Sequence, residues 1–171
     1  MSKELATRIA AVVRDAGGRV VGRTKLQKLT YFLVVSGLEE DVPFLYQHYG
    51  PYSESVAVAA REAHLLGLMH EKEEQAGWGG TYSIFTVEGK SENVVPASRL
   101  QLAKIAADAD AVELELAATA LFLFKEDRTD AWQETERRKP EKAMHGRLEK
   151  AKSLYQRLSA VETPERLPQL N

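Results

Sequence analysis

The chain has 171 residues, of which 44% are hydrophobic and 28% are charged. It is therefore long enough to form one domain, or one domain with a helical appendage, without metals or disulfides. It contains no cysteine, which excludes thiolate catalysis, disulfide frameworks and cysteine-based zinc or iron–sulfur sites. The formal net charge of −2 argues against a general nucleic-acid binder, although a local basic patch remains open.

The apolar segments predict a cytoplasmic protein with no membrane contact. Near the N-terminus, apolar residues are spaced as one face of a helix and are interrupted by Arg8 and Arg14. A secretory signal instead needs an unbroken apolar core. No run approaches the roughly 18 apolar residues of a membrane span.

Three helices are predicted in the first half of the chain. The first covers about 2–15, where apolar residues recur every three or four positions. The second begins near Thr24 as its N-cap and ends at Gly37. The third is capped by Ser53 and continues to Gly67.

Short extended segments separate and follow these helices. Residues 19–21 form an extended link, and the aromatic-rich segment 44–49 is predicted to be a strand. Gly50-Pro51 is predicted to be a turn. Residues 68–72 and 81–87 are predicted to form a hairpin with a long glycine-rich tip.

The predicted fold class is mainly α, of the α+β type, with two units and a tail. Helix, helix, strand, helix and hairpin is the element order of a winged helix, which predicts a winged-helix-like unit over 1–97 with the small β-hairpin as its wing. This unit is expected to pack on a C-terminal helical unit over 98–162. The proline-containing tail, 163–171, is expected to be frayed.

The helical unit should contain breaks at polar and proline positions. Its apolar face continues to Phe124, and Asp108 or Asp110 is expected to cap a break within it. A short helix is predicted at 130–138. Pro140 is expected to begin the last helix, because a first-turn position needs no backbone donor.

Two short motifs resemble those of a known family. They are the LQKL-x-YF helix, formed by Leu26, Gln27, Lys28, Leu29, Tyr31 and Phe32, and the YGPYS turn, formed by Tyr49, Gly50, Pro51, Tyr52 and Ser53. Both resemble the signatures of the YwgA-like family, which is related to the SocA-like antitoxin (Panacea domain) proteins. The resemblance implies a winged-helix-like fold without known catalysis, and SocA-like members act as antitoxins or adaptors that bind a protein partner.

The motif residues have two interpretations. In the structural one, the apolar residues are core, Gln27 is a polar bridge, Lys28 is a solvated stem, and the tyrosines pin the turn against the helix. In the functional one, Arg23, Lys25 and Lys28 form an edge that contacts phosphates. The structural interpretation is favoured because three cations are a weak signal.

Ordinary winged-helix DNA binding is disfavoured. The candidate nucleic-acid contacts are Arg23, Lys25, Lys28 and, on the presumed recognition helix, Arg61. DNA affinity comes chiefly from Lys and Arg that neutralise phosphates, yet residues 1–97 hold 10 Lys or Arg against 12 Asp or Glu. On the presumed wing, carboxylates would face the phosphate backbone, namely Glu71, Glu73 and Glu74.

Two other places are candidate partner-binding sites. Trp78 lies among glycines at the hairpin tip, where it could anchor an interface or fold back on its own domain. Basic residues outnumber acidic ones from 137 to 157, which indicates either a solvated helix face or a docking surface. The candidates there are Arg137, Arg138, Lys139, Lys142 and Arg147.

No catalytic, metal-binding or cofactor-binding motif occurs, so the chain is expected not to be an enzyme and to hold no cofactor. The leading hypothesis is a non-enzymatic protein-interaction module that binds a protein partner. Its role would be that of an antitoxin, adaptor or regulator in a toxin–antitoxin or phage-defence system. The alternative is a winged-helix DNA-binding transcriptional regulator, and a homo-oligomer is possible in either case.

Overall fold

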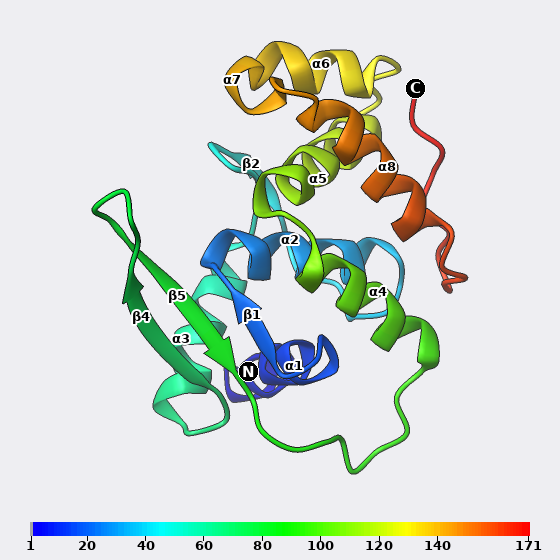
Figure 1. The fold of residues 1–171 in the computed structure, drawn as a ribbon. Helices are drawn as coiled ribbons and strands as arrows, with labels where there is room; N and C mark the ends of the chain where they lie inside the picture. Colours follow the sequence, from blue (N-terminus) through cyan, green and yellow to red (C-terminus); the bar gives the residue numbers. More distant parts are fainter. Residues whose placement is uncertain (1) are drawn as a thin grey trace.

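The computed structural model describes residues 2–171, and their arrangement is a mainly helical α+β fold with two small antiparallel sheets (Figure 1). The first half contains α1 (Ser2–Asp15), β1 (Arg19–Val21), α2 (Arg23–Val35), β2 (Leu45–Gln47), β3 (Gly50–Tyr52), α3 (Glu54–Leu65), β4 (His70–Gln75) and β5 (Thr81–Thr86). The second half contains α4 (Ala97–Asp108), α5 (Ala111–Lys125), α6 (Ala131–Arg138), α7 (Pro140–Ala143) and α8 (Arg147–Ser159).

The predicted N-terminal helices are present, with one error at a cap. The Ser53 hydroxyl caps α3 as expected, because its Oγ accepts a hydrogen bond from the Val56 amide at 3.3 Å. Thr24 does not cap α2, which begins one residue earlier and has Gly22 as its N-cap. Gly22 has a φ of 99°, and its amide donates to the Ser83 carbonyl of β5 at 2.7 Å. The attachment to the sheet therefore fixes the start of α2.

The larger sheet has the strand order β1-β5-β4 and is antiparallel throughout. The predicted extended link is thus a true strand, β1, in which Val20 lies opposite Phe85. The sheet and the helices α1, α2 and α3 occur in the first half of the chain, and the winged-helix assignment of this half stays a prediction. The β4–β5 hairpin projects from the body of helices (Figure 1).

Gly50 and Pro51 lie in a strand, β3, rather than in the predicted turn. β2 and β3 form a two-stranded hairpin in which Tyr46 lies opposite Pro51, so the turn residues are His48 and Tyr49. Proline is compatible with this strand because β3 has only one neighbouring strand and need not donate on its other side. Gly50 has a φ of 87°, and a Cβ there would lie 2.5 Å from the Thr119 hydroxyl oxygen.

The second half confirms one predicted break and contradicts one predicted start. The Asp110 carboxylate caps α5 by accepting hydrogen bonds from two backbone amides. Pro140 begins only the single turn of α7, and the last helix begins at Arg147. The chain cannot continue helically between them because His145 and Gly146 have φ values of 62° and 78°.

The C-terminal tail is packed and not frayed. Leu167 is buried in the common core. The Tyr155 hydroxyl of α8 donates to the Pro168 carbonyl at 2.6 Å, and the Glu165 amide donates to the Ser36 carbonyl at the end of α2 at 2.9 Å. The tail therefore joins α2 to α8, which the proline content of the segment did not indicate.

The two halves share one hydrophobic core, to which α2 contributes Phe32 and Leu33 and the later helices contribute Leu102, Leu116 and Leu154. This shared core places the α2 motif at the centre of the molecule. Helix α4 of the second half packs against both α1 and α2 (Figure 1).

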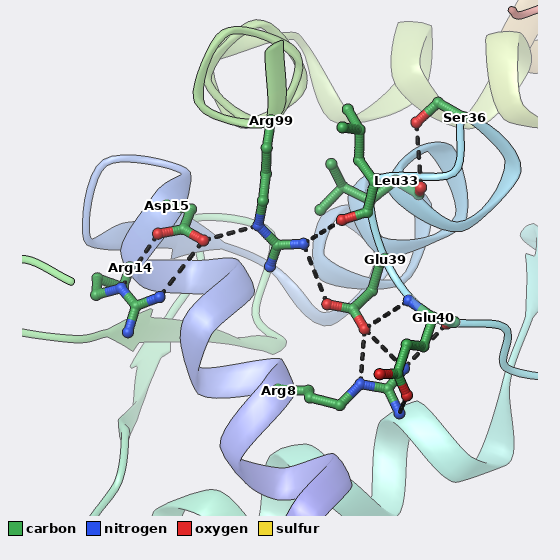
Figure 2. A network of polar contacts seen from close by, with 9 residues as sticks. Arg8, Arg14, Asp15, Leu33, Ser36, Glu39, Glu40 and Arg99 are labelled. Atoms are coloured by element: carbon green, nitrogen blue, oxygen red, sulfur yellow. Dashed lines mark hydrogen bonds and ion pairs between the residues drawn. The ribbon is translucent and has the colours of Figure 1, made fainter. Parts of the chain in front are cut away.

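A buried ion-pair network joins α1, α4 and the loop after α2 (Figure 2). Arg99 of α4 donates to the Asp15 carboxylate at 2.7 Å and to the Glu39 carboxylate at 3.1 Å. Its guanidinium also donates to the Leu38 carbonyl. Arg8 of α1 reaches Glu39 from the other side, at 2.6 Å. The three central side chains are at most 10% exposed.

We expect Arg99→Met to lower the free energy of unfolding by about 3 kcal/mol or more, because it leaves two buried carboxylates without their main partner. Urea unfolding at pH 7 measures this loss. Lys104→Met on the same helix is the matched control, since Lys104 forms an exposed pair with Asp108 that contributes about 0.5 kcal/mol or less. Equal losses for the two variants would contradict the assignment of Arg99 as the central link.

Candidate functional site

Side chains of the LQKL helix hold the YGPYS segment by its backbone. The Gln27 amide donates to the Ser53 carbonyl at 2.9 Å and accepts from the Ser53 amide at 2.8 Å. Both residues are buried. This reciprocal pair supplies the buried backbone with the partners that a third strand would otherwise provide, and it fixes the position where α3 begins.

Lys28 is buried, which corrects its predicted role as a solvated stem and removes it from a surface edge that could contact nucleic-acid phosphates. It is only 1% exposed, and its Nζ donates to the Pro51 carbonyl at 2.8 Å. Burial lowers the pKa of the Lys28 ammonium to about 8. The nearby Glu115 opposes this shift, whereas Lys139 and Lys142 add to it. Lys28 therefore has an ammonium group that is easier to deprotonate than an ordinary lysine.

The rest of the motif divides between core and surface. Gly50 and Pro51 of the strand are buried. The apolar residues of the helix are also buried, namely Leu26, Leu29, Tyr31 and Phe32. Tyr49, in contrast, is 58% exposed, and Tyr52 is half-buried, with its hydroxyl donating to Glu54 at 3.1 Å. The motif is thus a structural hub with two tyrosines at the surface.

A buried carboxylate of α5 clamps the same hairpin from the other side. Glu115 accepts from Lys139 at 3.0 Å and from Lys142 at 2.7 Å. Lys139 also donates to the His48 carbonyl at 2.8 Å, and the Lys142 Nζ lies 4.4 Å from the centre of the Tyr49 ring. Lys139 and Lys142 of the predicted basic docking surface therefore bind within the protein, between Glu115 and the β2–β3 hairpin. Lys139 is also buried.

Intramolecular pairing also involves the neighbouring arginines. Arg137 and Arg138 each donate to Glu134 at 2.6 Å, which holds the pKa of that carboxyl at about 2. Arg147 is exposed at the start of α8. The local excess of basic residues thus overstates the charge that a partner would meet.

The predicted phosphate-contacting edge is not a continuous edge. Lys25 is half-buried and donates to the Ala107 carbonyl at 3.0 Å. Arg23 is exposed but pairs with Glu71 of β4 at 2.9 Å. Arg61 of α3 is exposed, and within residues 2–171 it has no recorded hydrogen bond or ion pair. With Lys28 buried, Arg61 is the candidate nucleic-acid contact that stays exposed and without an ion-pair partner on the described surface.

The β4–β5 hairpin presents an indole at its tip. Trp78 is 77% exposed, and its ring lies over Gly80, where an added Cβ would come within 1.6 Å of a ring atom. Along β4, Glu73 faces solvent, while Glu71 accepts from the Ser83 hydroxyl at 2.6 Å. The tip is therefore aromatic, and the strand below it is acidic.

A cleft of about 300 Å³ lies between α2, α3 and the two hairpins. Its lining combines an apolar part, including Val56 and Phe85, with polar side chains, namely Arg23, Gln27, Lys28, Tyr49, Tyr52 and Arg61. The sequence did not predict this cleft because its walls come from segments that are far apart along the chain. A lysine between two core leucines in LQKL was the one local sign of a buried polar position.

Among the helices of residues 2–171, none combines the length and apolar character that a membrane crossing requires. Over the same residues, no group of three or more His, Asp or Glu side chains is placed to hold a metal ion.

Comparison with known proteins supports a YwgA-like relationship. A stretch of 77 residues is 35% identical to the uncharacterized protein YwgA of Bacillus subtilis (strain 168). The match covers 45% of this chain and 45% of that protein, so the chain spans less than half the length of the relative it matches. No protein-family model matches the chain.

Lys28→Met provides a test of the buried ammonium. Burying the charged form disfavours the native state below pH 8, and this penalty disappears as pH rises from the native pKa of about 8 to the unfolded value near 10.5. The free energy of unfolding of the wild type, relative to the variant, should therefore increase by about 3 kcal/mol across this window. Urea unfolding of both proteins between pH 7 and pH 10.5 measures it. A difference that does not change with pH would mean that the pKa of Lys28 is not lowered.

Proposed function

We propose that this protein is a non-enzymatic interaction module that binds a protein partner through the tip of the β4–β5 hairpin. The observation that carries the proposal is the 77% exposure of Trp78 on a hairpin that projects from the body. A large aromatic side chain in water is costly, and tryptophans of this kind dominate protein interfaces. Tyr82 of β5 is a second exposed aromatic residue of the same hairpin.

The charges of the same hairpin support a protein partner over DNA. A winged-helix protein that binds DNA needs cations facing the phosphates. Here Arg23 is paired with Glu71, and Lys72 is paired with Glu74. These pairs leave Arg61 as the free cation of the described surface around α3. A single free cation is too few to bind the phosphates of a DNA duplex tightly. The regulator that binds DNA is therefore the less favoured function.

The biological role follows from the family resemblance. SocA-like antitoxins are related to the YwgA-like proteins that this chain resembles, and they act by binding a protein. An antitoxin, adaptor or regulator in a toxin–antitoxin or phage-defence system is the corresponding role. Such a role requires an exposed anchoring residue and no reacting groups, and Trp78 supplies that anchor.

The test compares variants of the tagged full-length chain in its host. We expect the wild type to retain a protein partner in stoichiometric amount, and Trp78→Ala to weaken the purified complex by about 30-fold. Val94→Ala is the matched control, because Val94 is an exposed apolar residue outside the hairpin. The emission of Trp78 should shift to shorter wavelength when the partner binds.

Two outcomes would contradict the proposal. One is that no stoichiometric protein is retained by the wild type. The other is a salt-sensitive gel shift with duplex DNA at micromolar protein that Arg61→Ala abolishes and Trp78→Ala leaves unchanged. The second outcome would support the DNA-binding regulator instead.

A further inference from the structure

The cleft between α2, α3 and the hairpins has an excess of positive charge. Its lining contains three cations, Arg23, Lys28 and Arg61, and one carboxylate, Glu71. Arg23 and Glu71 neutralise each other at 2.9 Å. Lys28 and Arg61 are left without a carboxylate partner inside the cleft. Just outside it, Glu54 accepts the Tyr52 hydroxyl.

The Lys28 ammonium has hydrogen-bonding capacity that its protein contacts do not use. An ammonium has three donors, and one recorded bond, to the Pro51 carbonyl, engages Lys28 within the described residues. Glu115 lies near enough to attract the charge, but it is bonded to Lys139 and Lys142 instead. A buried cation with unmatched donors is costly unless an acceptor reaches it. Lys28 is among the residues that line the cleft, so an acceptor bound in the cleft would lie next to this side chain.

The remaining lining suits an organic group. Leu26, Val56, Ala60 and Phe85 give it an apolar wall, and the tyrosines add aromatic surface. The volume of about 300 Å³ corresponds to about ten water molecules and lies at the lower end of the range for small-molecule sites. A small molecule fits this space, whereas a folded segment of a protein does not.

We infer that this cleft binds a small organic phosphate monoester. Its phosphate would accept hydrogen bonds from Lys28 and Arg61, and its apolar or aromatic body would lie against Val56 and Tyr52. A phosphate monoester has a charge close to −2 at neutral pH, which matches the two unpaired cations. Arginine also pairs well with phosphate through parallel hydrogen bonds. The site is separate from the proposed partner-binding surface, because Trp78 does not line it.

Isothermal titration of the full-length chain with phenyl phosphate tests the inference at constant ionic strength. We expect saturable binding that is about ten-fold tighter than that of inorganic phosphate, phenol or benzoate. Inorganic phosphate lacks the organic body, phenol lacks the charge, and benzoate lacks the second negative charge. No binding of phenyl phosphate up to about 10 mM would overturn the inference. Benzoate or inorganic phosphate binding as tightly as phenyl phosphate would also overturn it.

Two variants locate the site. Lys28→Met and Arg61→Ala should each weaken phenyl phosphate binding by about ten-fold or more, which is the usual loss for a hydrogen bond between charged groups. Arg157→Ala is the matched control, since Arg157 is exposed on α8, far from the lining, and it should bind as the wild type does. Arg61 is exposed and free of recorded contacts, so Arg61→Ala keeps the test valid if Lys28→Met does not fold. Equal affinity of Arg61→Ala and wild type would overturn the assignment.

Discussion

The structure depends on a short run of backbone that has no neighbouring strand on one side. Pro51 and Ser53 are buried, and β3 pairs with β2 alone. A buried backbone group without a partner costs free energy comparable to a lost hydrogen bond. Two consecutive side chains of α2 meet this need, because Gln27 bonds both backbone groups of Ser53 and Lys28 bonds the Pro51 carbonyl. This arrangement orients the start of α3, and with it one wall of the cleft.

Charge counting along the sequence predicted a basic docking surface from residues that are largely paired within the protein. The partners of the basic residues near α6 and α7 lie outside the counted stretch: Glu134 comes three residues before Arg137 on the same helix, and Glu115 lies in α5. Glu115 lies in the apolar helix α5, whose face is otherwise core. An ion pair across 24 residues leaves no mark in local composition. The net charge that a partner meets is therefore set by tertiary pairing.

Local rules predicted the features that local physics controls. Apolar periodicity placed α1 within its observed bounds. The cap at Ser53 was predicted, and the cap at Asp110 was one of two alternatives, because each depends on a single side chain and the amides that follow it. The mainly helical α+β class followed from the same patterns. Features controlled by distant contacts were missed, namely the pairing of β3 and the packed tail. The break before α8, at His145 and Gly146, was also missed.

The candidate site shows this division most clearly at Lys28. Its position in LQKL was visible, but its burial could not be inferred from the local sequence. The nearby cations, Lys139 and Lys142, could not be inferred either, because they lie more than a hundred residues further along the chain. An apolar residue of similar volume would fill the space without the cost of burying a charge. Since Gln27 already fixes Ser53, the fold gains from Lys28 only the bond to Pro51. A charged group at that depth is better explained by a ligand that comes to it through the cleft than by the needs of the fold alone.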